Sequence, residues 1–174
     1  MNTIAEGKQY LRDNWKEGVV CPCCSQFVKL YKRKLNSNMA IVLYRIFREG
    51  EIWIKVEDFL RVNKIHTGHD WALLRNWGLL EEKPKEDTDY KDSKVSGYWR
   101  ITDKGMDFVF NAIRVPKHIT MFNNKFYGYA DAAETVCFKD CIGNNFNYNE
   151  LMRGVVRKDY RKLSQITIPL QNNT

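Results

Sequence analysis

The stretch that decides the fold is Asp70-Trp71-Ala72-Leu73-Leu74-Arg75-Asn76-Trp77-Gly78-Leu79-Leu80, which a polar segment separates from Gly97-Tyr98-Trp99-Arg100-Ile101-Thr102-Asp103-Lys104-Gly105. The first part predicts a helix that ends in a tight turn at Gly78, because glycine accepts the left-handed conformation of a helix C-terminus. The second part predicts a returning strand, followed by a helix that Thr102 caps. The pair therefore predicts helix, strand, loop, strand and helix in that order.

The residues before and after this stretch extend the pattern. Asn36-Ser37 offers an N-cap for a core helix whose apolar residues recur at helical spacing up to Gly50. Residues 52–56 are typical of a short strand and residues 58–62 of a short helix. The segment 83–97 is polar and carries both signs of charge, as expected of a loop, and the helix after Thr102 is expected to run through Ile113.

This order of elements carries a resemblance to a known family. With Leu-x-x-Trp-Gly-Leu-Leu before the loop and Ile-Thr-Asp-Lys-Gly after it, residues 36–114 resemble the winged helix-turn-helix superfamily of transcriptional regulators. The resemblance implies an α+β fold with a winged-helix core, and duplex DNA as the partner. The Cys-Pro-Cys-Cys segment and the aromatic-rich tail are similar to small uncharacterised proteins of phages and mobile elements.

Two flanking segments complete the prediction. Residues 4–17 are expected to form a helix with Ile4, Tyr10, Leu11 and Trp15 on its apolar side. Residues 119–122 and 125–129 predict a β-hairpin around Asn123-Asn124, with residues 134–138 adding a strand to the same sheet. Asn147 is expected to cap a last helix. The predicted domains are therefore 1–35, 36–115 and 116–174.

Cys21-Pro22-Cys23-Cys24-Ser25 resembles a zinc knuckle, in which Cys21 and Cys24 would bind Zn²⁺ and Cys23 would be the spacer. Only half of a tetrahedral site is present, so the pair His66 and His69, the pair Cys137 and Cys141, or the same cysteines of a second copy would have to complete it. The alternative is a turn with thiols and no metal. An odd number of cysteines without a secretory leader argues against a disulfide framework.

The charge favours an anionic partner. The net charge is +7 and the sequence pI is about 9.1. Residues 1–50 hold nine Lys/Arg against four Asp/Glu, residues 51–100 nine against ten, and the remainder ten against seven. The segment with the winged-helix pattern is thus the least basic part of the chain, which counts against a simple inference of DNA binding through it alone.

The predicted nucleic-acid contacts fall in three groups. In a helix-turn-helix, the second helix enters the major groove, and the loop between the wing strands grips the backbone. Asp70 and Leu73 oppose such a role, since one repels phosphate and the other is apolar. The candidate residues are Thr67, His69, Arg75 and Asn76 on the helix; Lys83, Lys85, Lys91 and Lys94 on the wing; and Lys32, Arg33, Lys34, Arg157, Lys158, Arg161 and Lys162 in the basic flanks.

Other function classes are less favoured. The histidines lack a companion catalytic motif, and no phosphate-cradling glycine loop occurs, so no enzymatic activity is predicted. No apolar run is long enough for a membrane span, and no signal peptide is evident, so a cytoplasmic location is expected. The main alternative to DNA binding is a protein-interaction module, for example against a host or defence factor, with Leu73, Trp77, Trp99 and the aromatic residues of the tail in the interface. A homodimer is compatible with either.

Overall fold

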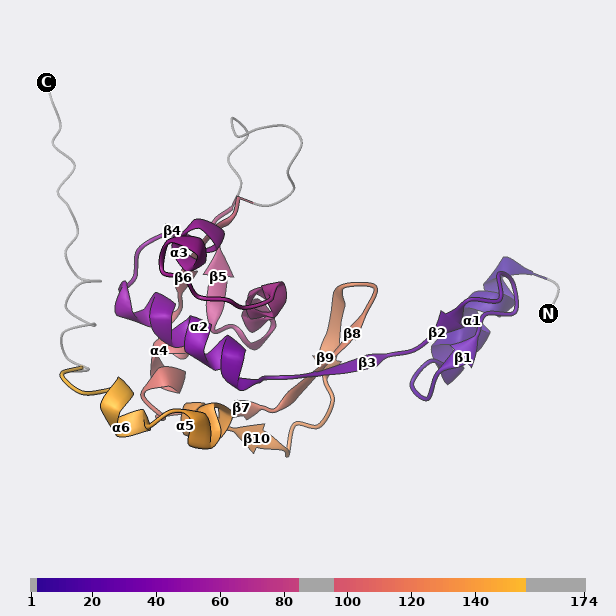
Figure 1. Ribbon diagram of the computed structural model, residues 1–174. Coiled ribbons are helices and arrows are strands. Elements are labelled where there is room, and N and C mark those ends of the chain that lie inside the picture. The colour runs from indigo at the N-terminus through magenta and orange to yellow at the C-terminus, as the bar shows by residue number, and fades with distance from the viewer. Residues whose placement is uncertain (1–2, 85–95, 156–174) are drawn as a thin grey trace, which may run out of the picture. The chain divides into compact units, whose positions relative to one another are not determined.

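The computed structural model describes residues 3–84 and 96–155, in which helices alternate with short strands in small antiparallel sheets (Figure 1). This mixture is consistent with the predicted α+β class. The chain divides into two compact units: unit 1 comprises Met1–Lys34 and Pro116–Glu134, and unit 2 comprises Leu35–Val115 and Thr135–Thr174. The C-terminal hairpin is therefore grouped with the N-terminal segment, rather than following the central domain as a separate extension.

The core of unit 2 is built around α2 (Ser37–Arg48). The side chain of Asn36 accepts a hydrogen bond from the Met39 backbone N–H at 3.0 Å, which confirms the predicted cap. The buried residues of α2 recur at helical spacing, and Leu43, Ile46 and Phe47 are fully buried. Because large apolar residues follow this spacing, one side of α2 contacts η1, α4 and α5.

A three-stranded antiparallel sheet flanks this core. Its strands are β4 (Ile54–Lys55), β5 (Leu80–Glu82) and β6 (Tyr98–Ile101), in the order β4-β6-β5. The register places Leu80 opposite Ile101 and Glu82 opposite Trp99, so these four side chains share one side of the sheet. The helix α3 (Val56–Val62) begins directly after β4. The observed strand is therefore shorter than the predicted 52–56, and the observed helix is longer than the predicted 58–62.

The decisive stretch forms a 3₁₀ helix, η1 (His69–Trp77), and Gly78 ends it with φ 70°. Trp71, Leu74 and Trp77 are 5%, 0% and 1% exposed. Their spacing of three residues matches the three residues per turn of a 3₁₀ helix, so all three side chains lie on one face. The predicted helix and its glycine stop are confirmed, whereas its tighter winding is a finding of the structure.

The two halves of the decisive stretch are joined by close backbone contacts. The Thr102 hydroxyl donates to the Gly78 carbonyl at 2.6 Å and accepts from the Gly105 N–H at 3.0 Å, so Thr102 caps α4 (Asp103–Val109) as predicted. A Cβ on Gly105 would lie 2.2 Å from the Leu79 carbonyl oxygen, which explains why glycine is needed there. The helix ends at Val109, before the predicted Ile113.

The described C-terminal part of unit 2 includes α5 (Phe138–Ile142), η2 (Gly143–Asn145) and α6 (Tyr148–Leu151). Asn147 caps α6, as predicted, by accepting from the backbone N–H groups of Asn149 and Glu150. The strand predicted at 134–138 was assigned to the wrong sheet. Its observed form, β10 (Thr135–Val136), pairs with β7 (Val115–Pro116) and not with the hairpin.

Unit 1 contains α1 (Ile4–Asn14), the small hairpin β1 (Val19–Val20) and β2 (Phe27–Val28), and a second sheet. That sheet joins β3 (Tyr31–Lys34), β8 (His118–Phe122) and β9 (Lys125–Tyr129) in the order β3-β8-β9. The turn between β8 and β9 holds Asn123 and Asn124 at φ 47° and 59°, as predicted.

The predicted apolar side of α1 is only partly correct. Ile4 is 73% exposed, and Gly7 is the residue of this helix that is buried. Trp15, just after the helix, packs edge-on against Phe122 and Tyr127, with ring centroids 5.2 and 4.9 Å away. This aromatic cluster therefore links the N-terminal segment to the β8-β9 hairpin within unit 1.

None of the helices in the described part of the chain is long and apolar enough to cross a membrane.

Candidate nucleic-acid interface

Arg75, the predicted base-reading residue of η1, is engaged within unit 2. Its guanidinium lies 3.4 Å from the Glu82 carboxylate and 5.9 Å from the centre of the Trp99 ring. The register explains this pairing, because Glu82 and Trp99 are opposite each other on β5 and β6. Arg75 contacts one oxygen of this carboxylate, and the other oxygen is buried and has no hydrogen-bond partner among the described residues. Contact with a guanine would compete with that pair.

The other residues predicted to contact nucleic acid at η1 also do not form a site that would bind an anion strongly. His69 is 86% exposed and lies 3.6 Å from Glu57, while Thr67 and Asn76 are half-buried. A cavity of about 480 Å³ between α3 and η1 is lined by both signs of charge, including Asp58 and Arg61. The acidic residues at this surface would repel phosphate, as Asp70 would.

The wing contributes one described residue, Lys83, which is half-buried and whose backbone N–H donates to Tyr98. The remaining predicted contacts lie outside the described residues: Lys85, Lys91 and Lys94 in the wing, and Arg157, Lys158, Arg161 and Lys162 in the C-terminal flank.

The predicted cluster Lys32, Arg33 and Lys34 has a different environment. All three residues belong to β3, an edge strand of its sheet, and all are exposed. No salt bridge to any of them forms within residues 3–84 and 96–155, whereas Lys55, Arg61, Arg75, Arg100, Arg114 and Lys117 each have a carboxylate partner. A phosphate that binds at β3 would therefore not have to displace a protein carboxylate.

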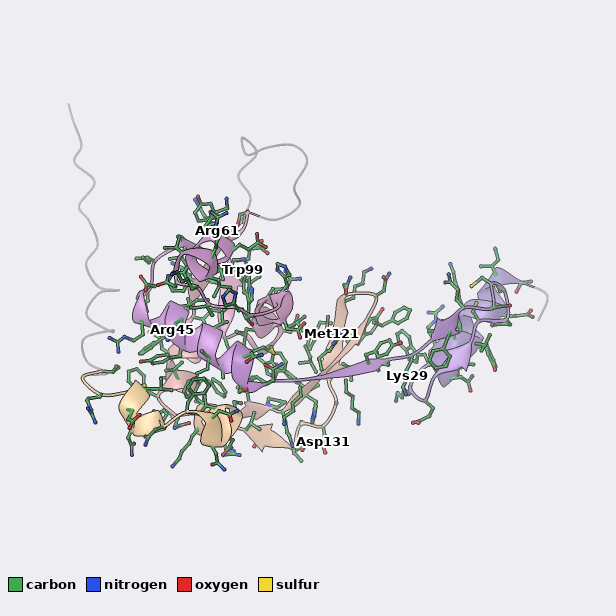
Figure 2. All side chains as sticks on the ribbon, in the orientation of Figure 1. Lys29, Arg45, Arg61, Trp99, Met121 and Asp131 are labelled. Atoms are coloured by element: carbon green, nitrogen blue, oxygen red, sulfur yellow. The ribbon has the colours of Figure 1, made fainter. Side chains whose placement is uncertain are left out.

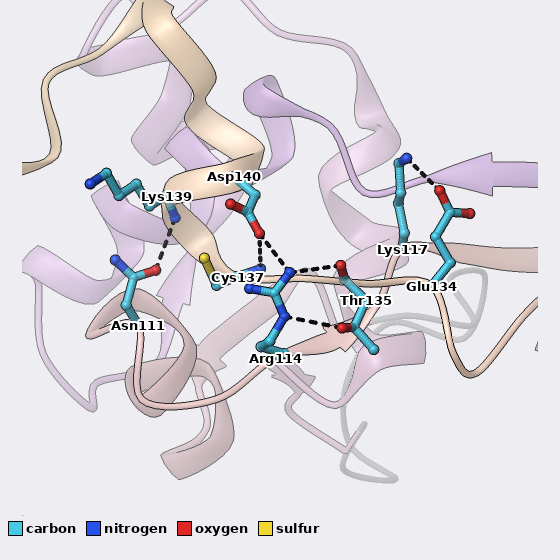
Figure 3. A network of polar contacts seen from close by, with 8 residues as sticks. All are labelled: Asn111, Arg114, Lys117, Glu134, Thr135, Cys137, Lys139 and Asp140. Carbon is cyan, nitrogen blue, oxygen red and sulfur yellow. Dashed lines mark hydrogen bonds and ion pairs between the residues drawn. The ribbon is translucent and has the colours of Figure 1, made fainter.

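Figure 3 shows two basic residues that have carboxylate partners, Arg114 and Lys117. Arg114 donates to the Thr135 backbone carbonyl and to the Asp140 carboxylate, both at 2.9 Å. The Cys137 backbone N–H and then Arg114 lower the pKa of Asp140 below its ordinary value. Lys117 pairs with Glu134 in the same way, at 2.5 Å. Each of these cations therefore already has a carboxylate partner, unlike the cations of β3.

The cysteine segment adopts a compact turn between β1 and β2. The Cys21 N–H donates to Gln26 at 2.7 Å, the Ser25 N–H donates to the Cys21 carbonyl at 2.9 Å, and Ser25 has φ 57°. Backbone N–H groups of Cys23 and then of Cys24 donate to the Cys21 sulfur, which lowers the pKa of this thiol although burial opposes the effect. A thiolate supported by backbone amides is what a metal-binding turn requires.

The thiols of this turn differ in exposure. Cys21 is 7% exposed, whereas Cys23 and Cys24 are exposed. A Cβ on Gly7 would lie 2.7 Å from the Cys23 sulfur, so α1 covers the turn on that side. Across residues 3–84 and 96–155, no three His, Cys, Asp or Glu side chains form a group that could hold a metal. The turn itself contributes the thiols of Cys21 and Cys24. The candidate pairs His66 with His69 and Cys137 with Cys141 both belong to unit 2.

The tryptophans predicted for a protein interface belong to the core. Trp77 and Trp99 are 1% and 4% exposed, and Leu73 is half-buried. The exposed aromatic side chains of the sheet in unit 1 are Tyr31, Phe126, Tyr127 and Tyr129. The last three belong to the tail aromatics that were predicted for a protein interface. The available sequence signal was that each strand places aromatic residues directly beside basic ones, Tyr31 before Lys32 in β3 and Phe126 after Lys125 in β9.

No family model, curated protein or solved structure matches this chain.

Proposed function

We propose that the chain is a non-enzymatic nucleic-acid-binding protein in which unit 2 is a winged helix and β3 provides the main phosphate contacts. The winged-helix assignment is supported by the order α2, β4, α3, η1, β5, β6 and by the sheet order β4-β6-β5. In this arrangement, η1 occupies the place of the recognition helix, and the segment between β5 and β6 occupies the place of the wing.

The observation that carries the proposal is which basic side chains have a carboxylate partner and which do not. Lys32, Arg33 and Lys34 are consecutive, exposed and without a carboxylate partner among the described residues, while Arg75 is paired with Glu82. Phosphate binding releases counterions from nucleic acid, and its free energy is largest where the protein cation is not already neutralised. We therefore assign most of the affinity to β3 and a smaller, orienting contribution to unit 2.

A winged helix typically binds duplex DNA, so the role that we propose is that of a DNA-binding regulator. The test is a gel-shift titration of the full chain with a duplex of arbitrary sequence at low salt. The triple variant Lys32→Gln/Arg33→Gln/Lys34→Gln should weaken binding at least tenfold.

A matched variant, Lys55→Gln/Arg61→Gln/Arg75→Gln, removes the same charge from residues of unit 2 that have carboxylate partners. It should bind nearly as tightly as the original chain. If the unit 2 variant loses binding and the β3 variant keeps it, the assignment to β3 is wrong. If the original chain binds no nucleic acid at all, the proposed function is wrong.

The cysteine turn provides a second proposal, that Cys21 and Cys24 hold Zn²⁺ together with the same pair from a second copy. The amide-supported Cys21 sulfur and the positive φ of Ser25 support this, since both give the turn the form of a zinc knuckle.

A further inference from the structure

The sheet β3-β8-β9 carries aromatic side chains that lie in two rows across one of its sides. The register places Tyr31 of β3 opposite Met121 of β8, and Met121 opposite Phe126 of β9. Residues that are opposite each other in a ladder have their side chains on the same side of the sheet. The next row holds Arg33, Ile119 and Tyr129. We call the outer residues of these rows the aromatic face: Tyr31, Arg33, Phe126 and Tyr129.

The outer rings of the two rows are accessible. Tyr31 is 53% exposed, and Phe126 and Tyr129 are each 41% exposed, whereas Met121 between them is 8% exposed. Figure 2 shows side chains projecting from both sides of the sheet that carries Met121. The rings of Phe126 and Tyr129 touch, with centroids 5.6 Å apart and planes inclined by 70°. The two rings therefore form one exposed aromatic surface.

A bulge separates this surface from the aromatic cluster on the other side. The register of β8 and β9 shifts between Thr120 and Met121, which leaves Tyr127 as the extra residue. Tyr127 packs against Trp15 and Phe122, so its ring has a structural role within unit 1. Within residues 3–84 and 96–155 no aromatic ring packs against Tyr31, whose side chain is 53% exposed.

The charge beside these rings indicates what they bind. Arg33 belongs to the aromatic face itself, and Lys32 and Lys34 lie on the same edge strand, all exposed. Proteins that bind single-stranded nucleic acid combine exposed aromatic rings with cations, because bases stack on the rings while the phosphates follow the basic groups. In a duplex the bases are stacked on each other, so their faces are not available to side chains on a sheet.

We propose that the aromatic face binds single-stranded nucleic acid, with bases stacked on Tyr31, Phe126 and Tyr129 and phosphates held along β3. The proposal rests on the proposed function, since it needs the cations of β3 to bind phosphate. It adds single strands as a second form of ligand, beside the duplex, and names the residues that distinguish the two forms. Stacking on a protein ring contributes about 1–3 kcal/mol per base, which is roughly 5- to 150-fold in affinity.

The test compares ligands of equal length on the full chain. Fluorescence anisotropy is measured with a labelled oligothymidine, a labelled oligouridine and a duplex of mixed sequence. The variant Phe126→Ala/Tyr129→Ala should bind both single strands at least tenfold more weakly and the duplex unchanged. The two single strands distinguish DNA from RNA as the preferred ligand.

Two further variants serve as controls. Phe146→Ala removes a ring of similar exposure, 43%, from unit 2 and should change nothing. Tyr129→Phe keeps a stacking ring and should bind single strands as the original chain does, which separates stacking from misfolding of the sheet.

The inference is overturned if the chain binds duplex but not single strands, or if Phe126→Ala/Tyr129→Ala binds both forms as the original chain does; the proposed function then stands. If neither the original chain nor any variant binds duplex or single strands, both the inference and the proposed function are overturned. If single strands bind and only the β3 triple variant weakens them, the phosphate contacts stand and the stacking is wrong.

Discussion

Replacing Gly105 by alanine should destabilise unit 2 more than any other single methyl group added to a glycine of its described part. The new Cβ would lie 2.2 Å from the Leu79 carbonyl oxygen and 2.7 Å from the Ile101 side chain. An ordinary carbon–oxygen contact is about 3.3 Å, so α4 would have to move away from the end of η1 by roughly 1 Å. Such a movement would stretch two hydrogen bonds, one from the Thr102 hydroxyl to the Gly78 carbonyl and one from the Thr102 backbone N–H to the Leu79 carbonyl.

The loss of unfolding free energy depends on which atoms the new methyl group would overlap. Overpacking costs typically about 1–3 kcal/mol, and the upper part of this range applies because a backbone carbonyl cannot rotate aside. With a urea dependence of roughly 2 kcal/mol per molar, a loss of about 2–3 kcal/mol lowers the unfolding midpoint by about 1–1.5 M. The measurement is urea unfolding followed by tryptophan fluorescence, since Trp71, Trp77 and Trp99 are buried in this unit.

The matched control is Gly68→Ala. A Cβ on Gly68 would meet nothing within 4 Å, and its φ of −73° suits alanine. That variant should unfold within about 0.5 kcal/mol of the original chain or be slightly more stable, because alanine restricts the unfolded state. Equal urea midpoints for Gly105→Ala and the original chain would refute the close packing of α4 on Leu79.

Three further predictions concern single contacts. Asn36→Ala should lower the unfolding free energy by about 1 kcal/mol, since the Met39 N–H loses its cap; an unchanged thermal midpoint would contradict this. The pKa of Asp140 is lowered in the folded state, so its stabilisation is present above its ordinary pKa of 3.8 and is lost as the pH falls through the lower value; Asp140→Asn should flatten that acid loss in urea titrations. If the cysteine turn binds zinc, the purified chain should hold about one metal per two chains and lose it in Cys21→Ser but not in Cys141→Ser; metal-free dimers would reject the site.

Local signals in the sequence correctly predicted the ends of several elements. Asn36, Thr102 and Asn147 are caps, and Gly78 stops η1, because each effect involves backbone groups only a few residues away. The 3₁₀ winding of η1 was not predicted, although the buried residues Trp71, Leu74 and Trp77 recur at a spacing of three, whereas an α-helical face would alternate three and four.

Contacts between distant segments were not predictable in this way. The pairing of β3 with β8 joins segments that lie before and after residues 35–115 in the chain, and nothing in Tyr31–Lys34 specifies that partner. The same limit led to the wrong sheet for β10. The pairing of Arg75 with Glu82 depends on how η1 lies against β5. The sequence could therefore identify the arginine as a candidate but could not show that it forms an ion pair with Glu82.

The central claim is that the cations of β3 bind nucleic-acid phosphates, and the salt dependence of binding tests it most directly. The affinity for a duplex is measured between 50 and 200 mM salt for the original chain and for Lys32→Gln/Arg33→Gln/Lys34→Gln. Each phosphate contact contributes about 0.9 to the slope of log affinity against log salt, so three lost contacts should reduce the slope by about 2.7. Equal slopes for the two proteins would contradict the account.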